Sequence, residues 1–217
     1  TNGSKLAFKI EGMSFQPSEF VKITLVFFVA AILSDKKNPF RYISSALFSV
    51  IHVLILVLSR DLGSAGIYCM VYLFMLYIAN RNLLTLAIGG VGGVGAFYLA
   101  YQMFSHVRIR VQNWLNPWTD MSNTGYQITQ SLFAIGTGGW QGMGLLQGNP
   151  KTIPLVTEDF VFSAIAEEFG VAFSILLIML YLVTVLHMFR MSARVQEFFH
   201  KLILSGLAVS LGTQVIL

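Results

Sequence analysis

Charged side chains are scarce in this sequence, and cysteine occurs once. Only 11% of the 217 residues are charged and 55% are hydrophobic, whereas roughly a quarter of the residues of an ordinary soluble domain are charged. A soluble fold of this size could not bury so much apolar surface, so a soluble domain is excluded. With Cys69 as the single cysteine, an intrachain disulfide and a cysteine metal site are excluded too.

Motifs typical of soluble enzymes and nucleic-acid-binding proteins are also missing. The four histidines show no metal-ligand spacing, and no Walker loop, Ser-His-Asp order or basic-aromatic stripe is present. Gly90, Gly92 and Gly95 match a G-x-G-x-x-G pattern inside an apolar run, which we interpret as close helix packing and not as a dinucleotide site. We expect His52 to hydrogen-bond a neighbouring helix. The net charge of +4 is more typical of membrane orientation than of nucleic-acid binding.

What the sequence has instead is six long apolar runs. They cover residues 17–34, 43–59, 63–79, 83–104, 160–188 and 202–217. Each is long enough to cross a hydrocarbon core of ~30 Å as a helix, the structure that satisfies backbone groups in lipid. The sequence therefore predicts an all-α polytopic membrane protein, with residues 1–217 as one partial transmembrane domain. The start at Thr1, without a signal peptide, and the stop at Leu217 inside an apolar run indicate a piece of a longer protein.

Basic residues predict the orientation of these spans. Three alternate connections carry them: Lys36, Lys37 and Arg41 in the first, Arg81 in the next, and Arg190, Arg194 and Lys201 in the last. By the positive-inside rule these connections are cytoplasmic. The Arg60-Asp61 turn and residues 105–159 are then outside.

The long outer connection, residues 105–159, has the composition of a structured loop. It holds all three tryptophans, and residues 126–135 have apolar side chains at helical spacing, which predicts a half-buried surface helix. Residues 136–144 are too rich in glycine for a helix and suit tight bends near a ligand. Pro150 and Pro154 bracket a run that we expect to be extended.

Ionisable residues at or inside the spans are candidates for function, because burying a charge in a membrane is costly. Glu19 and Lys22 share one face of the first span, and the alternative is a self-neutralised pair at the interface. Arg60 and Asp61 lie at the outer end of the second span, where interface snorkelling is the alternative. Asp159 stands at the outer end of the fifth span, where it is either a functional carboxylate or a helix cap.

Two more carboxylates, Glu167 and Glu168, lie well inside the fifth run. No basic residue is near them in the sequence, so we expect partners from other helices or a packing role. Eight residues of helix separate Glu167 from Asp159, about 12 Å along the axis, so a paired-carboxylate site is not expected.

Several short motifs, read in order, resemble the SEDS family of FtsW, RodA and SpoVE. They are residues 15–22 (FQPSEFVK), 60–65 (RDLGSA), Arg110 with 115–118 (LNPW), 125–127 (GYQ), 130–136 (QSLFAIG), the glycine string, 159–162 (DFVF) and 167–170 (EEFG). Each motif is modest alone, but together they extend over nearly the whole chain. Glu158 departs from the pattern, since many members have threonine there.

The resemblance implies a ten-helix bundle, of which this chain holds the fourth to ninth helices. It also implies an enzyme that polymerises lipid II into peptidoglycan glycan strands in the bacterial cytoplasmic membrane, for elongation, division or sporulation. Its implied partners are lipid II, a class B penicillin-binding protein and other divisome or elongasome membrane proteins, and no nucleic acid.

The resemblance further implies that Asp159 is the catalytic aspartate, in the outer loop 105–159. The residues implied for substrate binding are Glu19, Lys22, Arg60, Asp61, Arg110, Gln127, Gln130 and Ser131. The chemistry needs one general base and cations near a diphosphate; we expect no tightly bound cofactor, and a divalent cation, Mg or Mn, could assist. A lipid II flippase and a non-catalytic scaffold of the cell-wall machinery are the alternatives.

Overall fold

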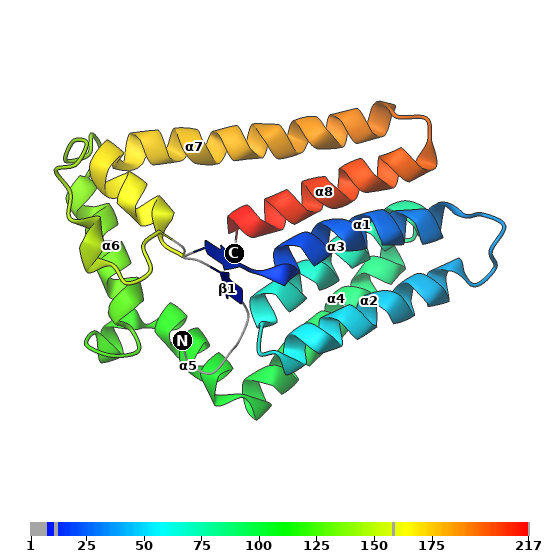
Figure 1. Ribbon diagram of the computed structural model, residues 1–217, viewed down its shortest axis with the longest axis horizontal. Helices are drawn as coiled ribbons and strands as arrows, with labels where there is room; N and C mark the ends of the chain where they lie inside the picture. The colour runs from blue at the N-terminus through cyan, green and yellow to red at the C-terminus, as the bar shows by residue number, and fades with distance from the viewer. Residues whose placement is uncertain (1–7, 11–12, 158, 217) are drawn as a thin grey trace. The chain divides into compact units, whose positions relative to one another are not determined.

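A computed structural model describes residues 8–10, 13–157 and 159–216 of the chain. In these residues six helices are long and apolar enough to cross a membrane: α1 (Pro17–Ser34), α2 (Arg41–Leu58), α3 (Leu62–Asn80), α4 (Leu83–Met103), α7 (Val161–Arg194) and α8 (Phe198–Ile216) (Figure 1). The predicted all-α polytopic membrane protein with six spans is confirmed. The observed bounds lie close to the predicted ones, except that α7 continues beyond Met188 to Arg194.

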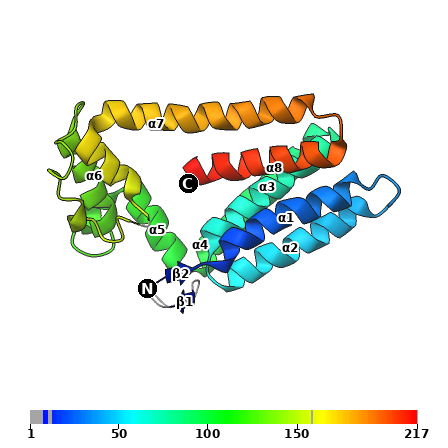
Figure 2. The same ribbon diagram turned by 45° about the horizontal axis from the view of Figure 1, so that its top comes forward.

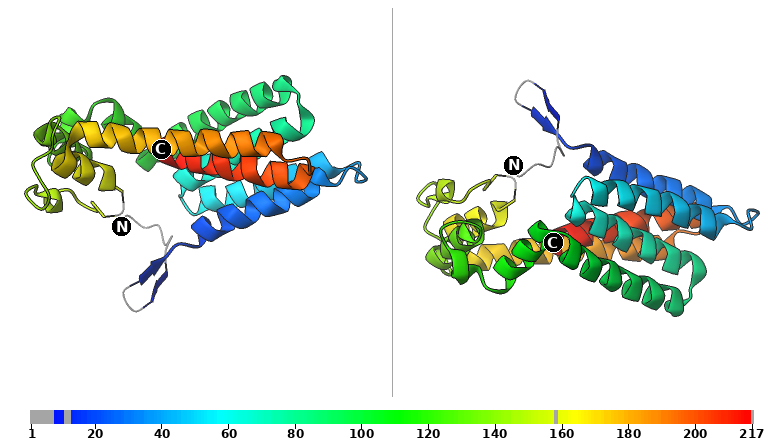
Figure 3. Two further views of the ribbon diagram at one scale, coloured as in Figure 1. Left: turned by 90° about the horizontal axis from the view of Figure 1, so that it is seen from above. Right: turned by 90° about the horizontal axis from the view of Figure 1, so that it is seen from below.

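Shorter elements complete the described chain. The strands β1 (Phe8–Ile10) and β2 (Met13–Phe15) pair antiparallel and form a hairpin before α1 (Figure 3), which we did not predict. Between α4 and α7 lie α5 (Ser105–Leu115), the 3-10 helix η1 (Pro117–Asp120), α6 (Tyr126–Gly138) and the 3-10 helix η2 (Pro150–Thr152).

The outer connection matches its prediction in part. The surface helix expected at residues 126–135 is α6, but it runs on through Gly136 to Gly138, so glycine does not exclude helix there. The run expected to be extended after Pro150 begins instead as η2.

By internal contacts the chain forms two compact units. The first holds residues 1–93 and 181–217, and the second residues 94–180. In the first unit α8 lies along α1 and α3, and α2 packs beside α1 and α3 (Figure 2). Their apolar side chains form one core: Leu25, Val26, Val29, Ala30 and Leu33 of α1, Tyr68, Val71, Tyr72 and Met75 of α3, and Leu202, Ile203 and Val209 of α8.

A glycine allows the close approach of α8 to that core. A Cβ atom at Gly206 would lie 2.8 Å from Met75 Sδ and 2.8 Å from Val26 Cγ1. Small residues at such crossings are typical of membrane helices, where van der Waals packing drives association. The side chains that face away from the core are also apolar, among them Leu47 and Leu54 of α2, as a lipid-facing surface requires.

Two smaller expectations about the spans are wrong. A Cβ atom added at Gly90, Gly92 or Gly95 would meet no described heavy atom within 4 Å, so the structure shows no close packing at these three glycines. His52 Nδ1 bonds the carbonyl of Phe48 over 2.9 Å, one turn back in its own helix, and not a neighbouring helix.

Candidate functional site

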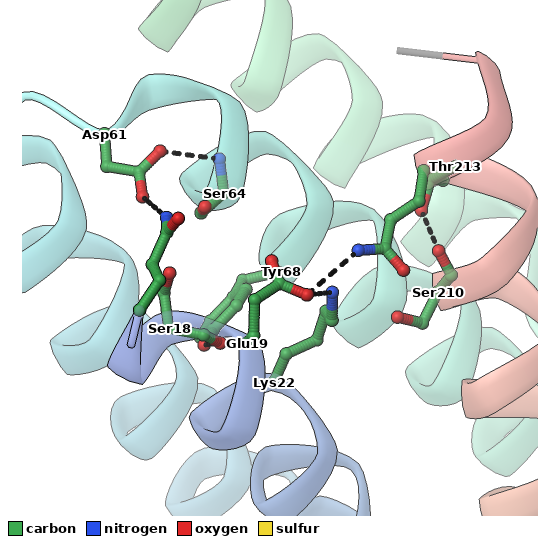
Figure 4. Close-up of polar contacts among 10 residues, drawn as sticks. Ser18, Glu19, Lys22, Asp61, Ser64, Tyr68, Ser210 and Thr213 are labelled. Carbon is green, nitrogen blue, oxygen red and sulfur yellow. Dashed lines mark hydrogen bonds and ion pairs between the residues drawn. The ribbon is translucent and has the colours of Figure 1, made fainter. Parts of the chain in front are cut away.

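The first polar cluster lies at the start of α1. Pro17 begins the helix and Glu19 lies in its first turn, where the helix dipole favours a carboxylate. Lys22, one turn on, donates from Nζ to Glu19 Oε2 over 2.7 Å (Figure 4). The lysine side chain is 7% exposed and the glutamate side chain 52%. A buried cation is therefore paired with a carboxylate that reaches the surface of this unit.

A groove of about 300 Å³ lies beside this pair, between α1 and α8. Its lining residues are Glu19, Phe20, Lys22, Ile23, Leu207, Ser210, Leu211 and Gln214. Gln214 Nε2 donates to Glu19 Oε2 over 3.4 Å, so α8 also contacts the carboxylate. Apolar walls with one ion pair suit a molecule that has an apolar chain and an anionic group.

Asp61 caps a helix, a role that we did not predict for it. Its Oδ1 accepts the backbone N–H of Ser64 over 3.1 Å at the start of α3, and its Oδ2 accepts from Gln16 Nε2 over 3.5 Å. The neighbouring Arg60 is exposed, has a left-handed backbone with φ of 63° and makes no ion pair with a described residue. The sequence signal for the cap is an Asp directly before an apolar run.

Two of the three polar residues predicted on α6 hold the second unit together. Gln127 Nε2 donates to the carbonyl of Pro154 over 3.0 Å, which ties α6 to the segment before Asp159. Ser131 Oγ lies 2.5 Å from Ser163 Oγ and links α6 to the first turn of α7. Gln130 is half-buried, and its side chain has no hydrogen-bond partner among the described residues.

Asp159 lies two residues before α7 and is exposed. Its backbone N–H donates to the carbonyl of Leu155 over 3.0 Å, and its carboxylate has no hydrogen-bond partner among the described residues. In the first turn of α7, the backbone N–H groups of Ser163 and Ala164 donate to the carbonyl of Phe160. The carboxylate therefore caps none of the described N–H groups of α7.

The most important feature missed by the sequence analysis is a break in α7. Gly170 has φ of 83° and ψ of 169°, and the helix changes direction there (Figure 1). Residues 138–144 lie against the break and complete its backbone hydrogen bonds. The bonds run from Met143 N–H to Glu167 O (2.9 Å), Gly144 N–H to Glu168 O (3.0 Å), Val171 N–H to Gly139 O (2.8 Å) and Ala172 N–H to Trp140 O (3.4 Å). We call residues 138–144 with 167–172 the glycine clasp.

Three glycines make this clasp possible. A Cβ atom would lie 2.1 Å from Ala166 O at Gly138, 2.2 Å from Glu168 O at Gly142 and 2.4 Å from Trp140 O at Gly170. These atoms belong to rigid backbone, so they cannot move aside. The expectation of tight bends in the glycine string is confirmed, but the bends bring the chain against α7.

Glu167 finds its partner in this loop and not on another helix, contrary to our expectation. Its side chain is buried, and its Oε1 accepts the backbone N–H of Asn149 over 3.0 Å, while Oε2 has no partner among the described residues. Because its carbonyl also accepts from Met143, Glu167 holds both ends of residues 143–149. The side chain of Glu168 is half-buried.

The remaining predicted residues are not joined to these contacts. Arg110 on α5 is exposed, and its guanidinium has no hydrogen bond or ion pair with a described residue. Glu158 lies outside the described residues. Within the described ranges, no three His, Cys, Asp or Glu residues are grouped so that they could hold a metal ion, and a divalent cation stays a prediction.

Known proteins resemble the chain over its whole length. The family model FtsW/RodA/SpoVE, described as cell cycle protein, matches residues 1–217. "Peptidoglycan glycosyltransferase RodA" of Mycobacterium tuberculosis is 34% identical over 98% of this chain and 49% of the relative. "Probable peptidoglycan glycosyltransferase FtsW" of Geobacter sulfurreducens is 32% identical over 98% of this chain and 59% of the relative.

A solved structure has the same fold. It is described by the words "Structural coordination of polymerization and crosslinking by a peptidoglycan synthase complex". The match has a TM-score of 0.75 and 25% identity, and it covers 100% of this chain and 62% of that one. The chain thus spans about half to three fifths of the length of the proteins that it matches.

Proposed function

Because the chain belongs to the FtsW/RodA/SpoVE family of cell cycle proteins, we propose that the whole protein is a peptidoglycan glycosyltransferase. It polymerises lipid II at the outer face of the bacterial cytoplasmic membrane. The names of the relatives support this reaction. The observation that carries the proposal is the exposed Asp159 carboxylate, which has no hydrogen-bond partner among the described residues.

The reaction needs a general base at the attacking sugar hydroxyl. A new bond forms between that hydroxyl oxygen and the anomeric carbon of the donor sugar, while the bond from this carbon to undecaprenyl diphosphate breaks. Asp159 takes the hydroxyl proton, a role for which a carboxylate must be both ionised and free to reach the substrate. An exposed carboxylate that neither caps α7 nor pairs with a described cation is free to reach the substrate.

The leaving diphosphate needs positive charge, and its prenyl chain needs an apolar surface. Lys22 lines a groove with apolar walls between α1 and α8, so this groove suits the boundary between the diphosphate and the chain. Arg60 and Arg110 are exposed cations that can contact a diphosphate. Gln130, half-buried and without a described partner, is the residue of α6 that is most open to substrate, whereas Gln127 and Ser131 position α6 through their bonds to Pro154 and Ser163. A divalent cation, Mg or Mn, could share the diphosphate charge.

Partners follow from the same proposal. A class B penicillin-binding protein would crosslink the strands that this protein makes, and other divisome or elongasome membrane proteins would accompany it. The solved relative belongs to a peptidoglycan synthase complex, which supports assembly with another synthase.

Replacing Asp159 with Asn tests the base. Asn keeps the size and polarity of the side chain but cannot accept the proton, so glycan polymerisation should fall by about 10²- to 10⁴-fold. The measurement is the strand length and amount made from lipid II by the full-length protein in vesicles, with its partner present. Asp120→Asn is the control, because Asp120 is a half-buried aspartate of the same unit whose carboxylate bonds Asn123 and Thr124, and this variant should polymerise normally.

Two results would overturn the proposal. Near-normal strand synthesis by the Asp159→Asn protein would show that Asp159 is not the base, and a lack of strand synthesis by the unaltered full-length protein would favour the flippase or the scaffold. Lipid II movement across the bilayer, without polymerisation by the unaltered protein, would favour the flippase alone.

A further inference from the structure

The loop of the glycine clasp ends in an exposed apolar tip. Trp140 is 72% exposed, Leu145 65% and Leu146 85%, and Met143 beside them is 47% exposed. A turn closed by the Gln147 N–H and the Gly144 carbonyl, 3.1 Å apart, presents the two leucines. We call Trp140, Met143, Leu145 and Leu146 the apolar tip.

The backbone of this tip is strained at an exposed leucine. Leu146 has φ of 62°, a left-handed conformation that glycine adopts freely and a branched side chain disfavours. Glycine is plentiful on both sides of this position, at Gly144 and Gly148, yet the left-handed site carries leucine. Strain of this kind is typical of positions where the side chain itself is used.

The length of α7 places the tip relative to the bilayer. Arg190 lies twenty residues after Gly170 and is exposed near the cytoplasmic end predicted for this helix. Twenty residues of helix measure about 30 Å, which is the thickness of the hydrocarbon core. Residues 171–186 contain no Asp, Glu, Lys, Arg or His. With the predicted cytoplasmic end at Arg190, the length of this apolar stretch places the break at Gly170 at the outer boundary of the hydrocarbon.

The clasp fixes the tip at that boundary. The carbonyl of Trp140 accepts from Ala172, just inside the boundary, and Met143 and Gly144 donate to Glu167 and Glu168, just outside it. Headgroups extend about 5 to 7 Å beyond the hydrocarbon on each side, so the tip lies in that layer. No residue from 138 to 149 carries a charge that would oppose insertion.

We propose that the apolar tip is a membrane anchor whose side chains insert into the boundary between headgroups and acyl chains of the outer leaflet. Tryptophan is enriched at this depth because its ring is apolar and its N–H is polar. The occupant is bilayer lipid, bound through apolar contact and not through recognition of one headgroup. The anchor holds residues 138–149 at a constant height, and α7 begins shortly after them.

Tryptophan fluorescence tests the anchor. In the full-length protein every tryptophan except Trp140 is replaced by phenylalanine, and the protein is placed in phosphatidylethanolamine–phosphatidylglycerol vesicles. We expect short-wavelength emission, stronger quenching by lipids with a nitroxide near the headgroup than by lipids with one near the chain end, and weak quenching by iodide. A matched protein with tryptophan only at Lys37→Trp, an exposed position in the polar turn after α1, should show the opposite.

Two results would overturn the proposal. Strong iodide quenching of Trp140 would place the tip in water, and resistance to both iodide and lipid nitroxides would show that protein covers it. If the tryptophan-depleted protein fails to fold, a spin label at Leu146→Cys in a Cys69→Ser background gives the same answer. Collisions of that label with oxygen should exceed those with a water-soluble nickel complex, and the reverse order would refute the anchor.

Discussion

The two units of the chain are stabilised by different kinds of contact. In the first, apolar side chains of α1, α3 and α8 interlock, and the sites of closest approach involve flexible side chains such as Met75. In the second, the glycine clasp joins backbone to backbone. A regular span satisfies its own backbone in lipid, so packing alone holds it. A broken span needs outside partners for its freed groups, so it depends on the backbone of another segment.

The largest effect on stability should come from glycines of the clasp. Gly142→Ala and Gly170→Ala would each place a Cβ atom within 2.4 Å of backbone at a positive φ. We expect a loss of about 4 kcal/mol in the local unfolding free energy, or roughly 10³-fold faster cleavage of residues 139–149 by a protease. Gly136→Ala is the matched control, because it meets nothing within 4 Å.

Gly139→Ala separates the effect of backbone strain from the effect of close backbone approach. Its φ is 54° and its ψ is −150°, a conformation adopted almost only by glycine, but a Cβ atom there has no neighbour within 4 Å, so only backbone strain of about 1 to 3 kcal/mol remains. Equal cleavage rates for the Gly139, Gly142 and Gly136 variants would show that close backbone approach does not hold the second unit.

A smaller effect is expected in the first unit, and it should be asymmetric. Glu19→Gln leaves the buried Lys22 ammonium without its carboxylate, which should destabilise the protein by about 3 kcal/mol. Lys22→Met leaves an exposed carboxylate and an apolar side chain, at a cost below about 1 kcal/mol. Thermal unfolding in detergent measures both.

The double variant Glu19→Gln with Lys22→Met is the control for this pair, since it should recover most of the lost stability. If Lys22 also contacts the diphosphate, Lys22→Met folds normally but polymerises poorly. Equal melting temperatures for the two single variants would contradict the asymmetry, and the pair would then be a simple interface pair.

The smallest effect is expected at low pH, where the hydrogen bonds of the loop after η1 should weaken. The backbone N–H and hydroxyl of Thr124 donate to Asp120, and Asn123 donates as well, which lowers the pKa of this carboxyl below its ordinary value of 3.8. A lowered pKa means that the bonds contribute full stability above the ordinary value and lose it as pH falls through the folded value.

Exchange of the Thr124 amide hydrogen measures this effect. Protection, corrected for the intrinsic effect of pH, should be constant around neutral pH and should weaken below 3.8. In the Asp120→Asn protein, protection of the Thr124 amide should no longer weaken at low pH, because asparagine has no carboxyl group to protonate. A pH dependence that persists in this variant would assign it to another group.

The sequence predicted the features that depend on residues close together in the chain, and it missed those that depend on residues far apart. The six spans followed from apolar length, and the Glu19–Lys22 contact followed from a spacing of three within one helix. The break at Gly170 did not, because apolar residues lie on both sides of it and the run from 160 to 188 looks like one continuous span despite Glu167 and Glu168. Gly139 and Val171, which bond each other, lie 32 positions apart. The residue types alone show that residues 136–144 are rich in glycine, but they do not show that this segment bonds α7.

The same limit applied to the candidate site. The sequence places Asp159 before a helix, but it does not show whether the carboxylate caps that helix. In the structure the N–H groups of Ser163 and Ala164 donate to the carbonyl of Phe160 and not to Asp159. Glu167 looked unpartnered because backbone donors such as Asn149 N–H carry no sequence signature.

The break at Gly170 also bears on how the chain is inserted into the bilayer. Residues 138–144 are synthesised before α7, so the carbonyls of Gly139 and Trp140 are at hand when Val171 and Ala172 arrive. Entering lipid without those partners would cost several kcal/mol for each bare N–H. The loop thus acts as a depth stop. With Gly170 at the proposed outer boundary, it fixes the vertical register of α7, so a longer apolar stretch after Gly170 would be accommodated by tilting of the helix or by local thickening of the bilayer.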